Sequence, residues 1–257
     1  MNVFANIGKT ATDSVRIIGR IGVFAMRAIA SIASGPFYWR AFTNALIRIG
    51  FTSLPVVGLT AIFTGGALAL NIFEGSLLPN TESFLPQILG VSIVRELGPV
   101  LAALMVAGRC SSAMAAEIGT MRVTEQIDAM ATLSVDPFKY LIVPRILATT
   151  IALPFLVLVA DVIGVYGGYL VSVYALGHSA PIYVQNLIDF LSADDVLSGL
   201  FKAGVFGFLI SLMGCYYGYM SRGGAGGVGS ATRTAVVAAA VAVLSANYFL
   251  TSLFVDF

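Results

Sequence analysis

Five long apolar stretches constrain the fold of this chain more than any other feature. Each is close to the roughly 20 residues that a helix needs to cross a hydrocarbon layer of about 30 Å. They run over residues 49–73, 86–108, 141–175, 196–219 and 234–254. The composition agrees, because only 11% of the residues are charged, against roughly 25% in soluble domains. The sequence therefore predicts an all-α membrane protein with five transmembrane helices, in which residues 1–257 form one domain.

The stretch over residues 7–33 is also apolar, but four basic residues interrupt it: Lys9, Arg16, Arg20 and Arg27. At 100° per residue they fall within about 40° of one another on a helical wheel. The opposite face carries Ile17, Ile21, Phe24 and Met26. Such a pattern predicts an amphipathic helix lying in the membrane interface. A first transmembrane helix is the alternative, but four cations make its insertion costly.

The connecting segments divide by charge, which predicts an orientation. One set carries Lys9, Arg16, Arg20, Arg27, Arg40, Arg48, Arg109, Arg122, Lys139, Arg145, Arg222 and Arg233. The other set carries only acidic residues: Glu74, Glu82, Asp189, Asp194 and Asp256. By the positive-inside rule the N-terminus is cytoplasmic and the C-terminus lies outside. We expect no cleavable signal peptide, and a net charge of +1 gives no indication of a nucleic-acid partner.

Arg95 and Glu96 stand about 14–15 Å into the second predicted span, at 1.5 Å per residue. Neighbouring helical side chains point about 100° apart, so each needs another partner or a wet cavity. Lys202 near the outer end of the fourth span, and Asp195 seven residues before it on the same face, are candidate partners. These four residues predict a cavity for an amphiphile with a charged head, because buried charges in spans usually mark function.

Two alternatives remain for these intramembrane charges. The four residues can instead form a structural ion-pair network that holds the helices in register. Asp161, in the third span, can be a buried hydrogen-bonding residue that packs helices or part of a conduction path.

Steps of small residues also predict close helix packing. These steps are Gly65-Gly66, Gly164-x-x-Gly167 and Gly214-x-x-x-Gly218.

Residues 117–133, between the second and third spans, predict a polar helix on the cytoplasmic side that a partner can grip. No nucleotide site is expected in this chain. Gly224-Ala225-Gly226-Gly227-Val228-Gly229 has dinucleotide-motif spacing but follows a transmembrane helix rather than a strand. The single histidine, His178 in an outer loop, excludes an H-E-x-x-H zinc site and is expected to be solvated. We therefore expect neither a cofactor nor a metal, and any ATP must be handled by another chain.

Several segments in the same order resemble the MlaE-type (YrbE-like) permease family of ABC lipid transporters, from about residue 40 to the C-terminus. They are Arg95-Glu96-Leu97-Gly98-Pro99-Val100, Ala107-Gly108-Arg109, Ala116-Glu117-Ile118-Gly119, Met121, Glu125-Gln126, Val135-Asp136-Pro137, Pro144-Arg145 and the glycine-rich segment from Arg222 to Arg233. One departure is Asn247, where some relatives carry an acidic residue. Any electrostatic role of that position is therefore in doubt.

The resemblance implies a homodimeric membrane subunit that moves phospholipids between the inner membrane and the periplasm or outer membrane. It implies cytoplasmic ABC ATPase subunits, a STAS-domain protein and a periplasmic MCE-domain ring as partners. Arg95, Glu96 and Lys202 correspond to polar positions facing the central lipid cavity, and residues 117–133 to the coupling helix. The residues expected to couple to the ATPase are Glu117, Met121, Arg122, Glu125, Gln126 and Asp128.

Two other classes of function are compatible with a chain of this kind. An autonomous ion-coupled transporter or channel could relay protons through Asp161 and Glu96, although the chain shows few embedded charges and no internal repeat. A passive membrane scaffold could anchor soluble partners, but Arg95 and Glu96 would then serve no purpose that offsets their insertion cost of roughly 2.5–3.5 kcal/mol.

Overall fold

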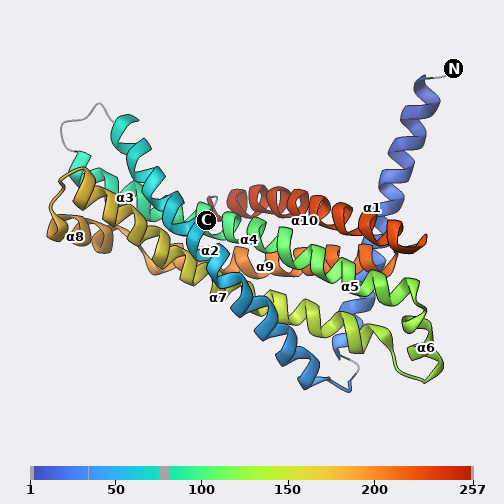
Figure 1. The fold of residues 1–257 in the computed structure, drawn as a ribbon. Coiled ribbons are helices and arrows are strands. Elements are labelled where there is room, and N and C mark those ends of the chain that lie inside the picture. Colours follow the sequence, from blue (N-terminus) through green and yellow to red (C-terminus); the bar gives the residue numbers. More distant parts are fainter. Residues whose placement is uncertain (1–2, 34, 76–80, 256–257) are drawn as a thin grey trace.

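A computed structural model describes residues 3–33, 35–75 and 81–255 of the chain. Within these residues the fold is built from helices and contains no strand (Figure 1). Five helical rods are long and apolar enough to cross a membrane, as predicted. They are Trp39–Gly75, Ser83–Val123, Phe138–Ala175, Ala193–Tyr219 and Gly224–Phe254.

Every rod is longer than the apolar stretch that predicted it. The second rod has 41 residues, about 60 Å at 1.5 Å per residue, or twice the thickness of the hydrocarbon layer. Hydropathy detects only the apolar part of a rod, whereas its polar end turns stay helical by packing on neighbours. The spanning elements are α2 (Trp39–Gly75), α3 (Thr81–Ser92), α4 (Gly98–Val106), α5 (Ser112–Val123), α7 (Val143–Leu170), α9 (Ala193–Tyr219) and α10 (Gly224–Val255).

Helices α7 and α9 form the centre of the bundle. Helix α7 packs between α2 and α9, and α9 also packs against α5 and α10. The fully buried side chains include Ile146 and Leu153 of α7, Phe206 and Ile210 of α9, and Val57 of α2. Two short helices mark the ends of the bundle. Helix α6 (Gln126–Thr132) lies at one end and helix α8 (Ala180–Phe190) at the other.

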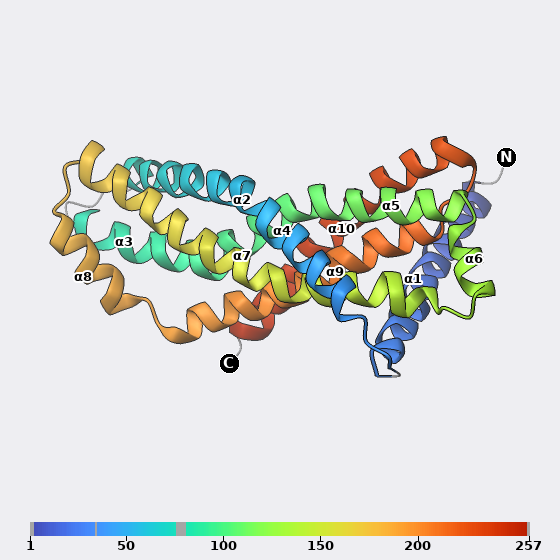
Figure 2. The ribbon, with the colours of Figure 1, turned by 60° about the horizontal axis from the view of Figure 1, so that its bottom comes forward.

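Helix α1 (Val3–Ala33) crosses the α6 end of the bundle at a steep angle to the spans (Figures 1 and 2). This is the arrangement expected of an interfacial helix rather than a transmembrane one. One detail of the predicted pattern is wrong. Phe24 does not belong to the free apolar face but is buried against the bundle, with its ring 5.1 Å from that of Phe138 and 5.5 Å from that of Tyr216.

The predicted coupling helix over residues 117–133 is also corrected, because it is not one helix. Residues up to Val123 continue the second rod as α5, held by Ile118, which is fully buried. Glu125 then adopts a left-handed conformation, with φ of 59°, and ends the regular hydrogen bonding. Helix α6 (Gln126–Thr132) follows as a separate short helix, anchored by the buried Ile127.

The outer loop after the third span contains a helix that hydropathy did not predict. Helix α8 packs on α3, and its Tyr183 is 1% exposed, with its ring 5.4 Å from that of Tyr169. His178, expected to be solvated, is instead partly buried, with its ring 6.0 Å from that of Phe73. A helix of 11 residues is too short to appear as a span, and only its packing on α3 distinguishes it from a loop.

The predicted small-residue contacts are present between α2 and α7. A Cβ atom added to Gly65 would overlap the carbonyl oxygen of Gly164, and one added to Gly167 would overlap the backbone of Ile62. The two backbones are therefore in direct contact, which only glycine permits. Gly214 and Gly218 also let α9 pack tightly, since added Cβ atoms would lie 3.0 Å from the backbone of Ser111 and Ala115, but this approach is less close than that of α2 and α7.

We predict that Gly65→Ala destabilises the protein, by about 1–3 kcal/mol as for overpacked cores, because α2 and α7 must separate. Gly50→Ala is the matched control on the same helix, since a Cβ atom there meets nothing within 4 Å. Unfolding in detergent measures both. Equal stability of Gly65→Ala and the control would contradict this close packing.

Candidate functional site

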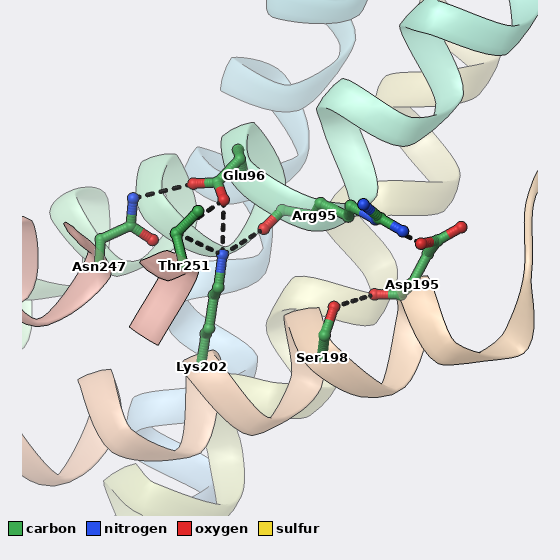
Figure 3. Close-up of polar contacts among 7 residues, drawn as sticks. All are labelled: Arg95, Glu96, Asp195, Ser198, Lys202, Asn247 and Thr251. Atoms are coloured by element: carbon green, nitrogen blue, oxygen red, sulfur yellow. Dashed lines mark hydrogen bonds and ion pairs between the residues drawn. The ribbon is translucent and has the colours of Figure 1, made fainter. Parts of the chain in front are cut away.

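The four charged residues predicted to form the cavity meet as two ion pairs between the segment Ile93–Leu97 and the first turns of α9 (Figure 3). The ammonium nitrogen of Lys202 lies 2.6 Å from Oε1 of Glu96. The guanidinium of Arg95 pairs with Oδ1 of Asp195. The partners expected from the helical spacing are thus the partners observed, and each of the adjacent residues Arg95 and Glu96 uses a different one.

The ammonium group of Lys202 is almost completely buried, with the residue 2% exposed. It donates to Glu96, to the carbonyl oxygen of Arg95 at 3.0 Å and to Oγ1 of Thr251 at 2.9 Å. An ammonium has three donors, and here each has an acceptor. A lysine can stay charged in an apolar span when its charge is paired and its donors are satisfied in this way.

The free carbonyl of Arg95 follows from the local sequence. In a regular helix this carbonyl would accept from the N–H of residue 99, but Pro99 has no N–H. The chain here forms a π-helical turn, Ile93–Leu97, in which Gly98 donates to Ile93 instead. Gly199 lets α9 approach this turn, since a Cβ atom there would overlap the carbonyl oxygen of Val94. Lys202 can therefore reach the orphaned carbonyl.

Asp195 has a second function besides its ion pair. Its Oδ2 accepts from the N–H of Ser192 at 3.0 Å, and Ser192 Oγ accepts from the N–H of Asp195 at 3.3 Å. This reciprocal arrangement is a capping box at the start of α9. Residue Asp195, itself 3% exposed, is therefore held in one orientation by its own helix, and that orientation positions Arg95.

Two members of the site come from α10 and were not predicted. Nδ2 of Asn247 donates to Oε2 of Glu96 at 2.9 Å, and Oγ1 of Thr251 donates to Oε1 at 2.8 Å. Asn247 was noted only as a departure from the family pattern. The two residues stand four apart in the last span, so their shared helical face was the available signal. The amide of Asn247 carries no charge, and this suits the carboxylate of Glu96 because Lys202 already neutralises it.

The site has no net charge, and two of its four charged side chains are partly exposed. Its two cations and two anions sum to zero, yet the side chain of Arg95 is 54% exposed and that of Glu96 is 37% exposed. Lys202 and Asp195 are buried beneath them. The arrangement can therefore present one guanidinium and one carboxylate to a ligand with separated charges, while the buried partners hold both in position.

Asp161 lies on α7, in contact with Gly98 just after the π-helical turn. The residue is 8% exposed, and its Oδ1 has no hydrogen-bond partner in the described part of the chain. It lines an apolar groove of about 450 Å³ together with Tyr166 and Tyr183. No hydrogen bond between described residues links it to Glu96.

The six residues expected to couple to an ATPase are spread over α5, α6 and the turn between them. Glu125, Gln126 and Asp128 are exposed, whereas Met121 is partly buried. Arg122 pairs with Asp128 at 2.5 Å, with its guanidinium 5.6 Å from the ring centre of Tyr219. This bridge fastens α6 to the end of the bundle.

Glu117, which is partly exposed, pairs with arginines of two other spans. Its Oε2 lies 3.4 Å from a guanidinium nitrogen of Arg48 and 3.2 Å from one of Arg145. The carboxylate therefore joins α5 to α2 and α7 at the edge of a cavity of about 470 Å³. A pull on α5 would be transmitted to two other spans through this residue.

Comparison with known proteins identifies the family. The MlaE permease family matches residues 42–253, which include the whole charged site and α6. The chain belongs to the MlaE permease family. A probable ABC transporter permease protein of Rickettsia bellii is 49% identical over 99% of this chain and 98% of its own length.

Two more distant relatives cover most of the chain. The intermembrane phospholipid transport system permease protein MlaE of Haemophilus influenzae is 31% identical over 98% of this chain and 97% of its own length. The chloroplastic protein TRIGALACTOSYLDIACYLGLYCEROL 1 of Arabidopsis thaliana is 36% identical over 91% of this chain and 67% of its own length. Family and fold together establish a multi-pass inner-membrane permease subunit of an ABC transporter.

We predict that Glu96 and Lys202 are energetically coupled. In a double-mutant cycle with Glu96→Gln and Lys202→Met, the double variant should lose about 1–3 kcal/mol less than the sum of the single variants. The reason is that each single change leaves a charge without its partner. Unfolding in detergent supplies the free energies.

The exposed pair of Arg122 and Asp128 is the matched control for this cycle. Its coupling should stay below about 1 kcal/mol, as for other exposed ion pairs. Additive effects of the two changes at Glu96 and Lys202 would show that the buried pair contributes no coupling.

Proposed function

We propose that this chain moves phospholipids between the inner membrane and the periplasm or outer membrane, driven by a separate ATPase subunit. The observation that carries the proposal is the balanced charged site within the spans. Its half-exposed Arg95 and Glu96 have no structural need to reach the surface, because their contacts already tie the π-helical turn Ile93–Leu97 to α9 and α10. A phospholipid headgroup has the matching chemistry.

Arg95 is the recognition element in this proposal. Its guanidinium can donate hydrogen bonds to a phosphate while Asp195 holds it in place, and Glu96 can face the amine of a zwitterionic headgroup. The surrounding surface is apolar and suits acyl chains, which are bound mainly by buried area. Recognition of the phosphate and the apolar chains alone predicts loose selectivity among phospholipids.

Two copies of the chain complete the site in this proposal. Helix α10 buries one stripe, Ala235, Ala239 and Val243, whereas Val241 and Leu244 are exposed. Half-exposed charges would be costly on a surface that faces lipid chains. A second copy covering α10 would convert the surface around Glu96 into a shared cavity. The homodimer is thus supported by the position of the charges and by the free face of α10.

The α6 end is the cytoplasmic end in this proposal, with the N-terminus inside and the C-terminus in the periplasm. Arg122, Lys139 and Arg222 lie at the α6 end, whereas Asp189 and Asp194 lie at the α8 end. This distribution supports the orientation through the positive-inside rule. Leu133, at the end of α6, is 76% exposed and suits an apolar pocket of an ATPase.

Further partners follow from the family resemblance alone. A STAS-domain protein would join the ATPase on the cytoplasmic side, and a ring of MCE domains would stand over the α8 end. An autonomous proton-coupled transporter is less well supported. It would need a path from Asp161 to Glu96, and the described residues provide no hydrogen-bonded link between the two carboxyl groups.

Arg95→Gln should lower ATP-driven phospholipid transfer in proteoliposomes at least about tenfold, because a neutral amide binds phosphate weakly. ATPase association of the same variant should persist, which would exclude global unfolding as the cause. Arg40→Gln removes an exposed arginine at the α6 end and should retain wild-type transfer. Unchanged transfer by an assembled Arg95→Gln complex would overturn the proposed headgroup site.

Leu133→Asp should abolish co-purification of the ATPase, because it places a charge in an apolar contact. The matched control is Ile188→Asp on α8, which alters an exposed apolar side chain at the opposite end. Retention of the ATPase by Leu133→Asp, or its loss from Ile188→Asp, would contradict the docking of the ATPase at α6.

A further inference from the structure

A basic groove lies where α1 crosses the α6 end of the bundle, well separated along the chain from the charged site at Glu96. Its volume is about 950 Å³, near the upper end of the roughly 300–1,000 Å³ typical of ligand sites. Four arginines line it, three from α1 and one from the turn before α10: Arg16, Arg20, Arg27 and Arg222. None of its described lining residues is Asp or Glu.

Three of the four arginines keep a positive charge that no ion pair balances within the described part of the chain. Arg20, Arg27 and Arg222 make no ion pair there, although the guanidinium of Arg27 lies 4.6 Å from the ring centre of Phe138. Neighbouring Arg122, in contrast, is balanced by Asp128. Three cations converging on one groove create a strong local attraction for an anion.

The floor of the groove is aromatic. Phe138, Tyr216 and Tyr219 line it and also enclose Phe24, which docks α1 on the bundle. Aromatic side chains of this kind are typical of the boundary between headgroups and acyl chains. The groove therefore offers cations for a headgroup and an apolar floor for the part of a lipid below it.

The faces of α1 set the depth of the groove in the membrane. Ile18, Met26 and Ile29 are 69%, 64% and 52% exposed, and on a helical wheel they form a free apolar face. The arginines fall between this face and the packed face that carries Phe24. An interfacial helix buries its apolar face at the acyl boundary and holds its flanking cations at headgroup level.

We propose that this groove binds the headgroup of an anionic phospholipid of the leaflet on which α1 lies. Its phosphate is held by Arg20, Arg27 and Arg222, and its acyl chains follow Val23 and Met26. The proposal rests on the proposed function only for the orientation of the α6 end. The bound lipid is a resident ligand that fastens α1 to the bundle, distinct from the lipid transported at Arg95. An acidic segment of a partner protein fits less well, because the groove continues into the free apolar face.

A site-specific probe tests this proposal on the full chain with the subunits that co-purify. The chain has one tryptophan, Trp39, so Trp39→Phe with Met220→Trp leaves this chain one reporter, in the groove, where Met220 is 45% exposed. The signal of the complex that carries Trp39→Phe alone is subtracted, which removes the contribution of the other subunits. The reporter protein is reconstituted in phosphatidylcholine nanodiscs containing either brominated phosphatidylglycerol or brominated phosphatidylcholine, and tryptophan quenching is measured.

Brominated phosphatidylglycerol should quench the reporter at much lower mole fraction than brominated phosphatidylcholine. Arg20→Gln with Arg222→Gln should weaken this preference roughly 25-fold, about fivefold for each arginine. Arg40→Gln is the matched control and should retain the preference for phosphatidylglycerol. Arg20→Lys with Arg222→Lys keeps both positive charges and should retain most of that preference. High salt should reduce the preference in the wild-type reporter.

Three outcomes would overturn the proposal. Equal quenching by the two lipids would show that the groove does not select anionic headgroups. An unchanged preference in the double variant would place the selectivity elsewhere. Loss of the ATPase from the double variant, with lipid quenching intact, would assign the groove to a protein partner. The first two outcomes leave lipid transfer through Arg95 unaffected. Loss of the ATPase would stop transfer in the double variant alone, so the proposed function is tested separately on the protein with an intact groove.

Discussion

The burial of one ammonium group, that of Lys202, determines the arrangement of the middle of this protein. A charge in an apolar span requires a counter-charge and an acceptor for each proton. Glu96, the carbonyl of Arg95 and Thr251 meet that requirement. Three features of the sequence make it possible, because Pro99 frees the carbonyl, Gly199 admits α9, and Thr251 brings α10 into the site. The π-helical turn Ile93–Leu97 and helices α9 and α10 are thus held in one register by one side chain.

The ion pairs show why a charged site in a membrane can be predicted from sequence more readily than most sites. Few charges lie inside the spans, so the partners of Arg95 and Glu96 had to come from a short set of candidates. Helical spacing selected Asp195 and Lys202 from that set. Asn247 and Thr251 escaped prediction because polar uncharged residues are common in spans and carry no comparable insertion cost.

The spans were predicted because hydropathy reports burial in lipid directly. The errors arose where packing between protein segments decides the structure. The break at Glu125 divides the coupling segment, and α8 depends on Tyr183 packing on α3. Phe24 lies in a cage of aromatic rings from distant segments, and no periodicity within α1 distinguishes that environment from lipid. At Tyr183 and Phe24 a large side chain is buried by protein rather than by membrane.

The central claim is that an ATPase-driven permease holds phospholipid at the charged site. Native mass spectrometry of the tagged chain, gently extracted from its own membrane, tests this claim most directly. The account predicts two copies of the chain together with ATPase subunits and bound phospholipid. A chain that carries neither an ATPase nor a phospholipid would contradict the account and would instead favour an autonomous transporter or a membrane scaffold.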